Sequence, residues 1–272
     1  MNQFLKLPKV VLVTGASSGI GRACASRFAA LGWEVYGTSR SAGAGPAAVQ
    51  MLKLDVDDAE SVRACVTSLL QRAERIDLVV NNAGRAMLGA CEETSADEAR
   101  ALFETNVFGV MRVINAVLPT LRAQRSGAIV NVGSLSGFVG VPFHGVYAAS
   151  KHALAGYTEA LRLEVAEYGV RVALIEPAAH RTQIQMQRPR QSLLLYDAGR
   201  RRVESIIREQ IERGESPERV VDAIVAAACS PAPRLRYRVG AKASLAYWAR
   251  RLLPDRLCEY GIRREFRLPV GL

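Results

Sequence analysis

A tyrosine and a lysine four residues apart are the side chains best suited to chemistry in this sequence. Tyr147 and Lys151 stand in the run Val-Tyr-Ala-Ala-Ser-Lys, and four residues is about one helical turn, so both project from the same helix face. A free phenol titrates near pH ~10 and is a poor base at neutral pH, whereas an adjacent ammonium favours the phenolate and lowers its pKa. The pair therefore predicts an acid–base tyrosine. By itself, the same spacing also occurs on solvated helices as a surface contact.

Three other motifs favour catalysis over a surface contact. They are the glycine cluster Thr14-Gly15-Ala16-Ser17-Ser18-Gly19-Ile20-Gly21, the run Asn81-Asn82-Ala83-Gly84, and Ser134, thirteen residues before Tyr147. The glycine cluster follows an apolar run and opens a helical pattern, so its backbone N–H groups can hold a pyrophosphate. Gly15 permits the tight turn, Gly19 lets the backbone approach the phosphate, and Gly21 lets the helix pack against the strand.

The order and spacing of these motifs resemble the short-chain dehydrogenase/reductase family over roughly residues 9–240, and the residues around Tyr147 look most like its hydroxysteroid and retinol dehydrogenase branch. The resemblance implies a catalytic tetrad of Asn106, Ser134, Tyr147 and Lys151. Tyr147 would exchange the proton, and Lys151 would hold the nicotinamide ribose and lower the tyrosine pKa. Ser134 would bind the substrate oxygen, and Asn106 would kink its helix and hold a proton-relay water.

The resemblance also implies a nicotinamide cofactor. Its predicted contacts are Gly15, Ser17, Ser18, Gly19, Ile20, Gly21, Arg40, Asp55, Val56, Asn82, Ala83, Gly84, Tyr147, Lys151, Pro177, Ala178 and Thr182. Arg40 ends the second predicted strand, where a carboxylate would bind the ribose 2′-hydroxyl of NAD(H) and a cation a 2′-phosphate. The sequence therefore predicts NADP(H) over NAD(H), with a solvated arginine as the alternative.

Two of these positions, and His180 close to them in the sequence, carry open alternatives or a departure from the family pattern. Asp55 is either an adenine contact or a loop cap. Ala178 replaces the usual glycine after Pro177, which puts the nicotinamide carboxamide contact there in doubt. His180 either faces the substrate or lies on the surface of a lid.

The elements that position these residues follow an alternating pattern. Short β-branched runs alternate with helical patterns, as in the βαβ units of a parallel sheet. We predict an α/β fold, a single-domain Rossmann-type doubly wound parallel sheet of about seven strands with helices on both faces. The predicted strands are 9–14, 34–38, 51–54, 76–80, 128–132, 171–175 and 237–239, and the predicted helices are 19–31, 58–72, 96–103, 107–124, 146–167 and 217–229, with Asp57 and Ser216 as N-caps.

Length and charge set the organisation of the chain. The 272 residues suit one domain, with a mobile substrate lid at about 178–215 and a basic C-terminal extension at about 241–272. Residues 231–272 hold ten lysines and arginines but three acidic residues, so most of the formal net charge of +10 is C-terminal. Leu245, Trp248, Leu252 and Leu253 accompany it at helical spacing, which predicts a helix that packs by one face or lies on an anionic membrane surface.

Composition also disfavours several classes. No nucleic-acid motif accompanies the charge, and five scattered cysteines with three histidines predict no metal site. No apolar run approaches the ~20 residues of a membrane-spanning helix, and Met1–Pro8 is too short for a secretion signal, so we expect a cytoplasmic protein.

The predicted function is an NADP(H)-dependent oxidoreductase that interconverts a lipophilic alcohol, primary or secondary and steroid-, retinoid- or lipid-like, with its ketone or aldehyde. We expect a homodimer or homotetramer. A 3-oxoacyl carrier-protein reductase is one alternative, because the basic C-terminus could attract an acidic carrier. A non-catalytic NADP(H)-sensing protein is another, and the presence of both Tyr147 and Lys151 disfavours it.

Overall fold

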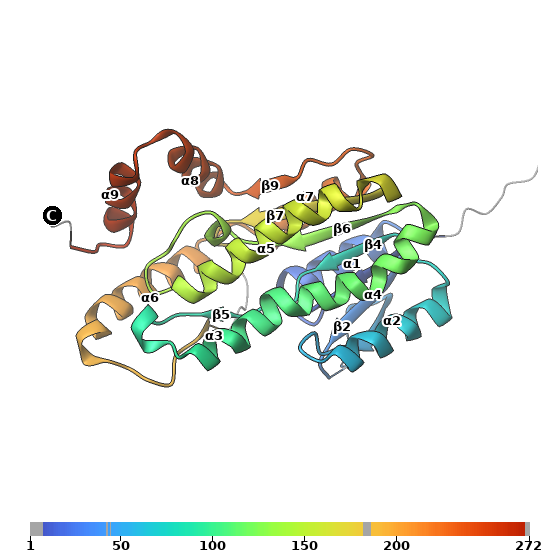
Figure 1. Cartoon of the computed structure of the whole chain (residues 1–272), viewed down its shortest axis with the longest axis horizontal. Helices are drawn as coiled ribbons and strands as arrows, with labels where there is room; N and C mark the ends of the chain where they lie inside the picture. The colour runs from blue at the N-terminus through green and yellow to red at the C-terminus, as the bar shows by residue number, and fades with distance from the viewer. Residues whose placement is uncertain (1–7, 42, 44, 182–185, 270–272) are drawn as a thin grey trace, which may run out of the picture.

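Seven parallel strands form the centre of the molecule (Figure 1). A computed structural model describes residues 8–41, 43, 45–181 and 186–269. The strands are β1 Val10–Val13, β2 Glu34–Ser39, β3 Val49–Lys53, β4 Leu78–Asn81, β6 Gly127–Val132, β7 Val170–Pro177 and β9 Arg236–Val239. Their order is β3-β2-β1-β4-β6-β7-β9, and each neighbouring pair is parallel. The order reverses direction between β1 and β4, which is where such sheets bind ligands at their carboxyl ends.

Helices cover both faces of this sheet, as predicted. In β1, Val10 and Leu12 pack on one side while Val11 and Val13 pack on the other, so the strand is buried on both faces. The first side is covered by α2 (Ala59–Ala73), α4 (Gly109–Gln124) and α5 (Gly145–Glu164). The second side is covered by α1 (Gly19–Ala30) and α7 (Pro217–Cys229).

One predicted helix cap is wrong by a residue. The cap of α2 is Asp58, whose carboxylate accepts a hydrogen bond from the Glu60 N–H at 2.9 Å. Asp57 instead accepts hydrogen bonds from Arg85 and from the Thr105 hydroxyl, each at 3.0 Å, so it ties the loop after β3 to its neighbours. The predicted cap Ser216 is confirmed, since its hydroxyl accepts from the Glu218 N–H.

The long helical stretch Ala96–Gln124 contains a change of helix type. It consists of α3 (Ala96–Phe103), a π-helical turn over Glu104–Phe108, and α4. The stretch is long and apolar enough by composition to cross a membrane, which departs from the prediction that no segment approaches that length. Half of its most apolar part is buried, and the apolar residues of α4 belong to the core, as in the core helix of a globular domain.

The C-terminal third contains two helices that were not predicted, over 197–212 and 255–265, and one that was predicted from Leu245, Trp248 and Leu252. The predicted lid segment contains β8 (Met186–Gln187), which pairs with β5 (Ala86–Met87), and a helix α6 over Asp197–Glu212. After β9 the chain forms α8 (Ala241–Leu252) and α9 (Asp255–Glu265), which stand at one end of the molecule, with α8 next to the carboxyl end of β9 (Figure 1). The sequence does contain a helical pattern for α6, since Val203, Ile206, Ile207 and Ile211 have helical spacing. The many arginines between them made the segment look like a polar loop.

Candidate active site

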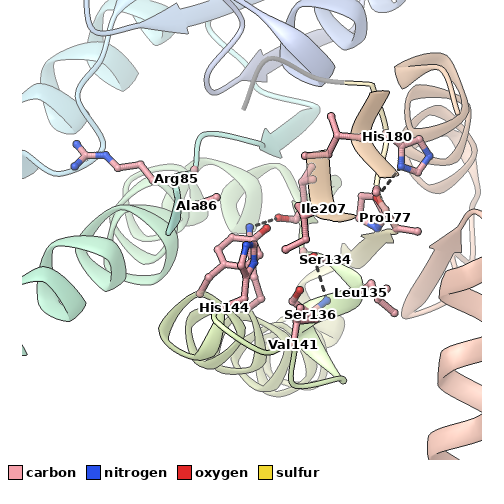
Figure 2. A pocket seen from close by; sticks show the side chains of 18 of the residues that line it. Arg85, Ala86, Ser134, Leu135, Ser136, Val141, His144, Pro177, His180 and Ile207 are labelled. Carbon is pink, nitrogen blue, oxygen red and sulfur yellow. Dashed lines mark hydrogen bonds between the residues drawn. The ribbon is translucent and has the colours of Figure 1, made fainter. Parts of the chain in front are cut away.

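A cavity of about 1000 Å³ lies at the carboxyl ends of the strands. It is lined by every predicted catalytic or cofactor residue except Gly21, Asn106 and Thr182. Thr182 lies outside the described residues, and Gly21 and Asn106 sit behind the lining. Figure 2 shows part of this cavity, with Ser134 and His144 from the core and Ile207 from α6 around it. The sheet topology thus brings together motifs that are far apart in the sequence.

The turn between β1 and α1 has a backbone shape that needs glycine. Gly15 and Gly19 have φ angles of +68° and +54°, in the left-handed region. A Cβ on Gly21 would lie 2.2 Å from the Gly15 carbonyl oxygen, so the helix packs closely on the strand. The first turn of α1 borders the cavity, and its N-cap Ser18 makes no side-chain capping bond. The free N–H groups of this helix start are therefore available to an anion.

The motif after β4 holds this turn in place. The Thr14 hydroxyl accepts hydrogen bonds from the N–H groups of Asn82 and Ala83, both at 3.0 Å. In return, the Asn82 side-chain amide donates to the carbonyls of Thr14 and Gly15, at 3.0 and 3.2 Å. These bonds fix the strand ends on either side of the point where the sheet order reverses.

The ends of β2 and β3 line the same end of the cavity. Arg40 is exposed there, and beside it the Ser39 hydroxyl is buried without a hydrogen-bond partner among the described residues. The Asp55 carboxylate accepts a bond from the Asp57 N–H at 3.1 Å, so the loop-cap alternative is realised while Asp55 also borders the cavity. An exposed cation and an unpartnered hydroxyl side by side suit a phosphate group.

Asn106 lies in the π-helical turn, which is the local distortion predicted for its helix. Its side chain is 1% exposed, accepts from the Arg85 N–H at 2.8 Å, and donates to the Arg85 carbonyl and the Ser150 hydroxyl. Asn106 therefore ties the loop after β4 to α5, one residue before Lys151. Its predicted role in a proton relay remains a prediction.

Ser134 and Tyr147 meet at the middle of the cavity. Ser134 lies two residues after β6, and its hydroxyl accepts from the Ser136 N–H at 3.1 Å, so it caps the short turn that follows. Burial raises the pKa of Tyr147, and a hydrogen bond with Ser134 opposes this shift. The direction is opposite to the predicted lowering, because no charge beside the phenol outweighs its loss of water.

Lys151 is buried one helical turn after Tyr147. Its ammonium donates to the Val132 carbonyl at 3.0 Å and lies 5.9 Å from the centroid of the Tyr147 ring. Burial lowers the pKa of Lys151 to about 8. The lysine is thus placed near the phenol, but its hydrogen bond goes to the strand.

Two histidines at the cavity extend the predicted set. His144 was not predicted; its ring contacts that of Tyr147 edge-on at 5.4 Å, and burial lowers its pKa to about 4, so it is neutral at physiological pH. His180 is 3% exposed, and its Nδ1 lies 2.8 Å from the Ala178 carbonyl (Figure 2). A carbonyl only accepts, so Nδ1 carries the proton. The lid-surface alternative for His180 is therefore wrong.

The far wall of the cavity is mostly apolar and comes from the C-terminal third. Its apolar members are Ile207 and Ile211 of α6, Leu245, Ala246, Ala249 and Leu253 at α8, and Leu257 and Ile262 of α9. The same helices add the polar groups of Gln210, Lys242, Arg250 and Glu265. The sequence predicted an apolar helix face in the C-terminal segment, but it did not predict that α6 would line the cavity. Among the residues that the structure describes, no group of three or more His, Cys, Asp or Glu side chains is arranged to hold a metal ion.

Comparison with known proteins gives consistent matches over this fold. A family profile described as short chain dehydrogenase matches residues 9–193. A 3-ketodihydrosphingosine reductase of Bacteroides thetaiotaomicron is 35% identical over 261 residues, 94% of this chain and 97% of that protein. Estradiol 17-beta-dehydrogenase 1 of Rattus norvegicus is 35% identical over 254 residues, 84% of this chain and 72% of its own length.

Solved structures agree with these matches. A short-chain dehydrogenase from Streptomyces avermitilis superimposes with a TM-score of 0.82 at 33% identity, covering 96% of this chain and 98% of its own. A short chain dehydrogenase/reductase from Burkholderia phymatum in complex with NAD gives a TM-score of 0.77 at 26% identity, covering 97% and 98%.

Proposed function

The chain belongs to the short-chain dehydrogenase/reductase family of oxidoreductases acting on alcohol and keto groups, and we propose that it uses NADP(H) to interconvert a lipophilic alcohol and its ketone or aldehyde. One observation carries the proposal. A single cavity has the glycine turn at one end, Ser134 and Tyr147 in the middle, and an apolar chamber at the other.

The residues at the first end fit a dinucleotide. The free N–H groups of α1 suit the pyrophosphate, and Arg40 with Ser39 suits a ribose 2′-phosphate, which is the basis for proposing NADP(H) over NAD(H). When bound, the nicotinamide supplies or accepts the hydride. Lys151, buried at the centre, would hold the ribose hydroxyls next to it. The Burkholderia relative carries NAD, so a nicotinamide dinucleotide suits this fold, whichever of the two is preferred.

Tyr147 would exchange the proton. Burial keeps its phenol protonated at neutral pH, so we propose that it donates a proton to the carbonyl oxygen during reduction while the Ser134 hydroxyl holds that oxygen. The phenolate that results would form near the ammonium of Lys151, whose charge stabilises it. A raised pKa makes the phenol a weaker acid, so its proton transfer depends on the charge of Lys151 to stabilise the phenolate as it forms.

The apolar chamber would hold the substrate. Its walls are mostly aliphatic, and its size suits a long-chain or polycyclic ketone better than a small one. The names of the relatives, a 3-ketodihydrosphingosine reductase and an estradiol dehydrogenase, support a lipid-like class. We further propose that the enzyme acts as a homodimer or homotetramer in the cytoplasm.

Turnover measurements test the proposal. We expect purified protein to oxidise NADPH faster than NADH with a long-chain 3-ketone or a ketosteroid, and slowly with acetone. Preference for a 3-oxoacyl group on a carrier protein over the free ketones would favour the carrier-protein reductase instead. Binding of NADPH without turnover of any ketone would leave only a sensing role.

A further inference from the structure

Large apolar side chains are exposed along the hairpin formed by α8 and α9. Leu245, Trp248, Leu252, Leu253, Leu257 and Tyr260 are each between 45% and 71% exposed. Leu245, Trp248 and Leu252 are spaced by three and four residues, so they share one face of α8. Scattered exposed leucines are ordinary, but six within sixteen residues form a patch that soluble monomers rarely leave uncovered.

Arginines are interleaved with the apolar residues of this patch along the chain. Arg251, Arg256 and Arg264 are exposed, and none of them pairs with an acidic side chain among the described residues. The described part of the segment, 241–269, has seven lysines and arginines against three acidic residues. An apolar helix face flanked by arginines is the pattern of a helix that lies in the plane of an anionic bilayer surface.

The patch is continuous with the substrate chamber. Leu245, Leu253 and Leu257 are exposed and also line the cavity, and Ala249 lies between them on the cavity side of α8. A bilayer seated on the hairpin would therefore cover the outer leucines and meet the apolar wall of the chamber. A lipophilic molecule could pass along this wall without crossing water, so its CH₂ groups would not be exposed to solvent.

We propose that the α8–α9 hairpin docks on an anionic lipid surface. Charge decides between this partner and a second copy of the chain. A symmetric pair would place the same excess of arginines face to face, which is unfavourable, whereas phosphate headgroups complement them. Docking needs no turnover, so it stands or falls separately from the proposed oxidoreductase activity.

Vesicle sedimentation with the full-length protein tests the docking surface. We expect binding to phosphatidylcholine vesicles containing phosphatidylglycerol, little binding to phosphatidylcholine alone, and release as salt rises above ~0.1 M. Trp248→Ser with Leu252→Ser should weaken binding at least about tenfold, since both side chains lie outside the cavity lining. Arg251→Glu with Arg256→Glu should also weaken it by about tenfold or more. The matched control is Leu31→Ser with Leu163→Ser, which removes two exposed leucines elsewhere.

Several outcomes would overturn docking. These are no binding to either vesicle, equal binding to both, or equal losses in the apolar variant and its control. Sedimentation equilibrium is the second measurement: a wild-type dimer that the Trp248/Leu252 variant converts to monomer would show that a second copy covers the patch. Turnover of a small water-soluble ketone should be the same in all variants, which verifies that they are folded. An inactive wild type that still binds vesicles would remove the proposed activity and leave docking intact.

Discussion

At the scale of single residues, the centre of the site is a phenol and an ammonium that have both lost water. Burial raises the pKa of Tyr147 and lowers that of Lys151, so each group is pushed toward its neutral form. The two shifts have one cause and opposite chemical effects. The tyrosine becomes a weaker acid that keeps its proton, while the lysine is easier to discharge. Any stabilisation of the phenolate by the lysine must therefore develop during the reaction.

Replacing Tyr147 by Phe tests the proton role. The substitution removes one hydroxyl from a half-buried ring, so the fold and NADPH binding should be retained. Turnover should fall by ~10²–10⁴-fold, the usual contribution of general acid–base catalysis. Steady-state kinetics and fluorescence titration of NADPH measure the two quantities. Turnover within a few-fold of wild type would remove the catalytic assignment.

Replacing Lys151 by Met tests the cost of burying its charge. The pKa of Lys151 is about 8 in the folded protein, compared with 10.5 for a lysine in the unfolded chain. Between these two pH values the unfolded chain binds more protons than the folded protein, so the stability of the wild type rises with pH. Below pH 8 the full penalty applies, roughly 3 kcal/mol, part of which the bond to Val132 offsets. The cofactor-free variant should thus be more stable than wild type at pH 7 by about 2 kcal/mol.

Urea unfolding at several pH values measures this difference. The gain should shrink as pH rises through the window from about 8 to 10.5, because the wild-type lysine loses its charge there. Lys53→Met, at an exposed position of β3, is the control and should show no such pH dependence. A variant less stable than wild type at pH 7 would mean that Lys151 is a net stabilising contact.

Replacing Arg40 by Asp tests cofactor choice. The carboxylate would repel a 2′-phosphate and could accept a hydrogen bond from a 2′-hydroxyl, so the ratio of kcat/KM for NADPH over NADH should fall by at least about tenfold. Arg63→Asp, an exposed position on α2, controls for the change in net charge. An unchanged ratio would place the phosphate against another group, with Arg22 or Ser39 as candidates.

At the scale of elements, α6 is attached to the body by a buried ion pair. Arg200 pairs with Glu93, whose side chain is fully buried and also accepts from the N–H groups of Leu193 and Ala90 at 2.9 Å. Burial raises the pKa of Glu93, but Arg200 and these N–H groups outweigh it and hold the pKa below its usual range. The Glu93 carboxylate is thus the buried charge among several contacts that tie the described part of the predicted lid to the body, which also include the β5–β8 pairing and the Tyr196–Glu92 hydrogen bond.

Replacing Arg200 by Met should detach α6. It leaves Glu93 buried without its cation, which typically costs about 3–5 kcal/mol. We expect hydrogen exchange in α6 to accelerate, thermal stability to fall, and KM for bulky ketones to rise, because Ile207 and Ile211 of α6 line the chamber. Arg201→Met is the control, since Arg201 is 74% exposed and its ion pair is worth little. Equal effects of the two substitutions would contradict the role of the buried pair.

The same elements show how far the sequence could be read. The seven strands of the central sheet and the five helices that cover it follow from alternating β-branched and helical runs in the sequence. The glycine turn follows from the spacing of its glycines. The helix α6 was not predicted from the sequence, because its buried face is determined by packing against α9 and Leu88 rather than by helix propensity. The direction of the Tyr147 pKa shift was predicted wrongly, because the shift is caused by burial. Burial depends on the tertiary structure, and the Tyr-x-x-x-Lys spacing carries no information about it.

At the scale of the whole molecule, the fold separates two tasks along one cavity. The N-terminal two thirds of the chain supply six of the seven strands and the described residues predicted to bind cofactor, while α6, α8 and α9 supply the apolar chamber. The separation explains why the fold and the chemistry could be predicted from short motifs, whereas the substrate could not. The chamber depends on how three helices pack on the sheet, and side-chain spacing does not determine that geometry.

Shortening the chain after Gly240 tests this division of tasks. The truncated protein lacks α8 and α9 and should lose at least about tenfold in kcat/KM for a long-chain ketone, since even one lost methylene contact costs ~1–3 kcal/mol. A small ketone should lose less than about threefold, and the Kd for NADPH should hardly change. Because Ala243 and Phe266 are buried, the truncated chain could unfold for unrelated reasons. Leu253→Ala with Leu257→Ala, two lining positions that are partly exposed, gives the same comparison in the full chain. Equal losses for long and short ketones in the double variant would make the hairpin ordinary packing and leave the substrate chamber without its proposed outer wall.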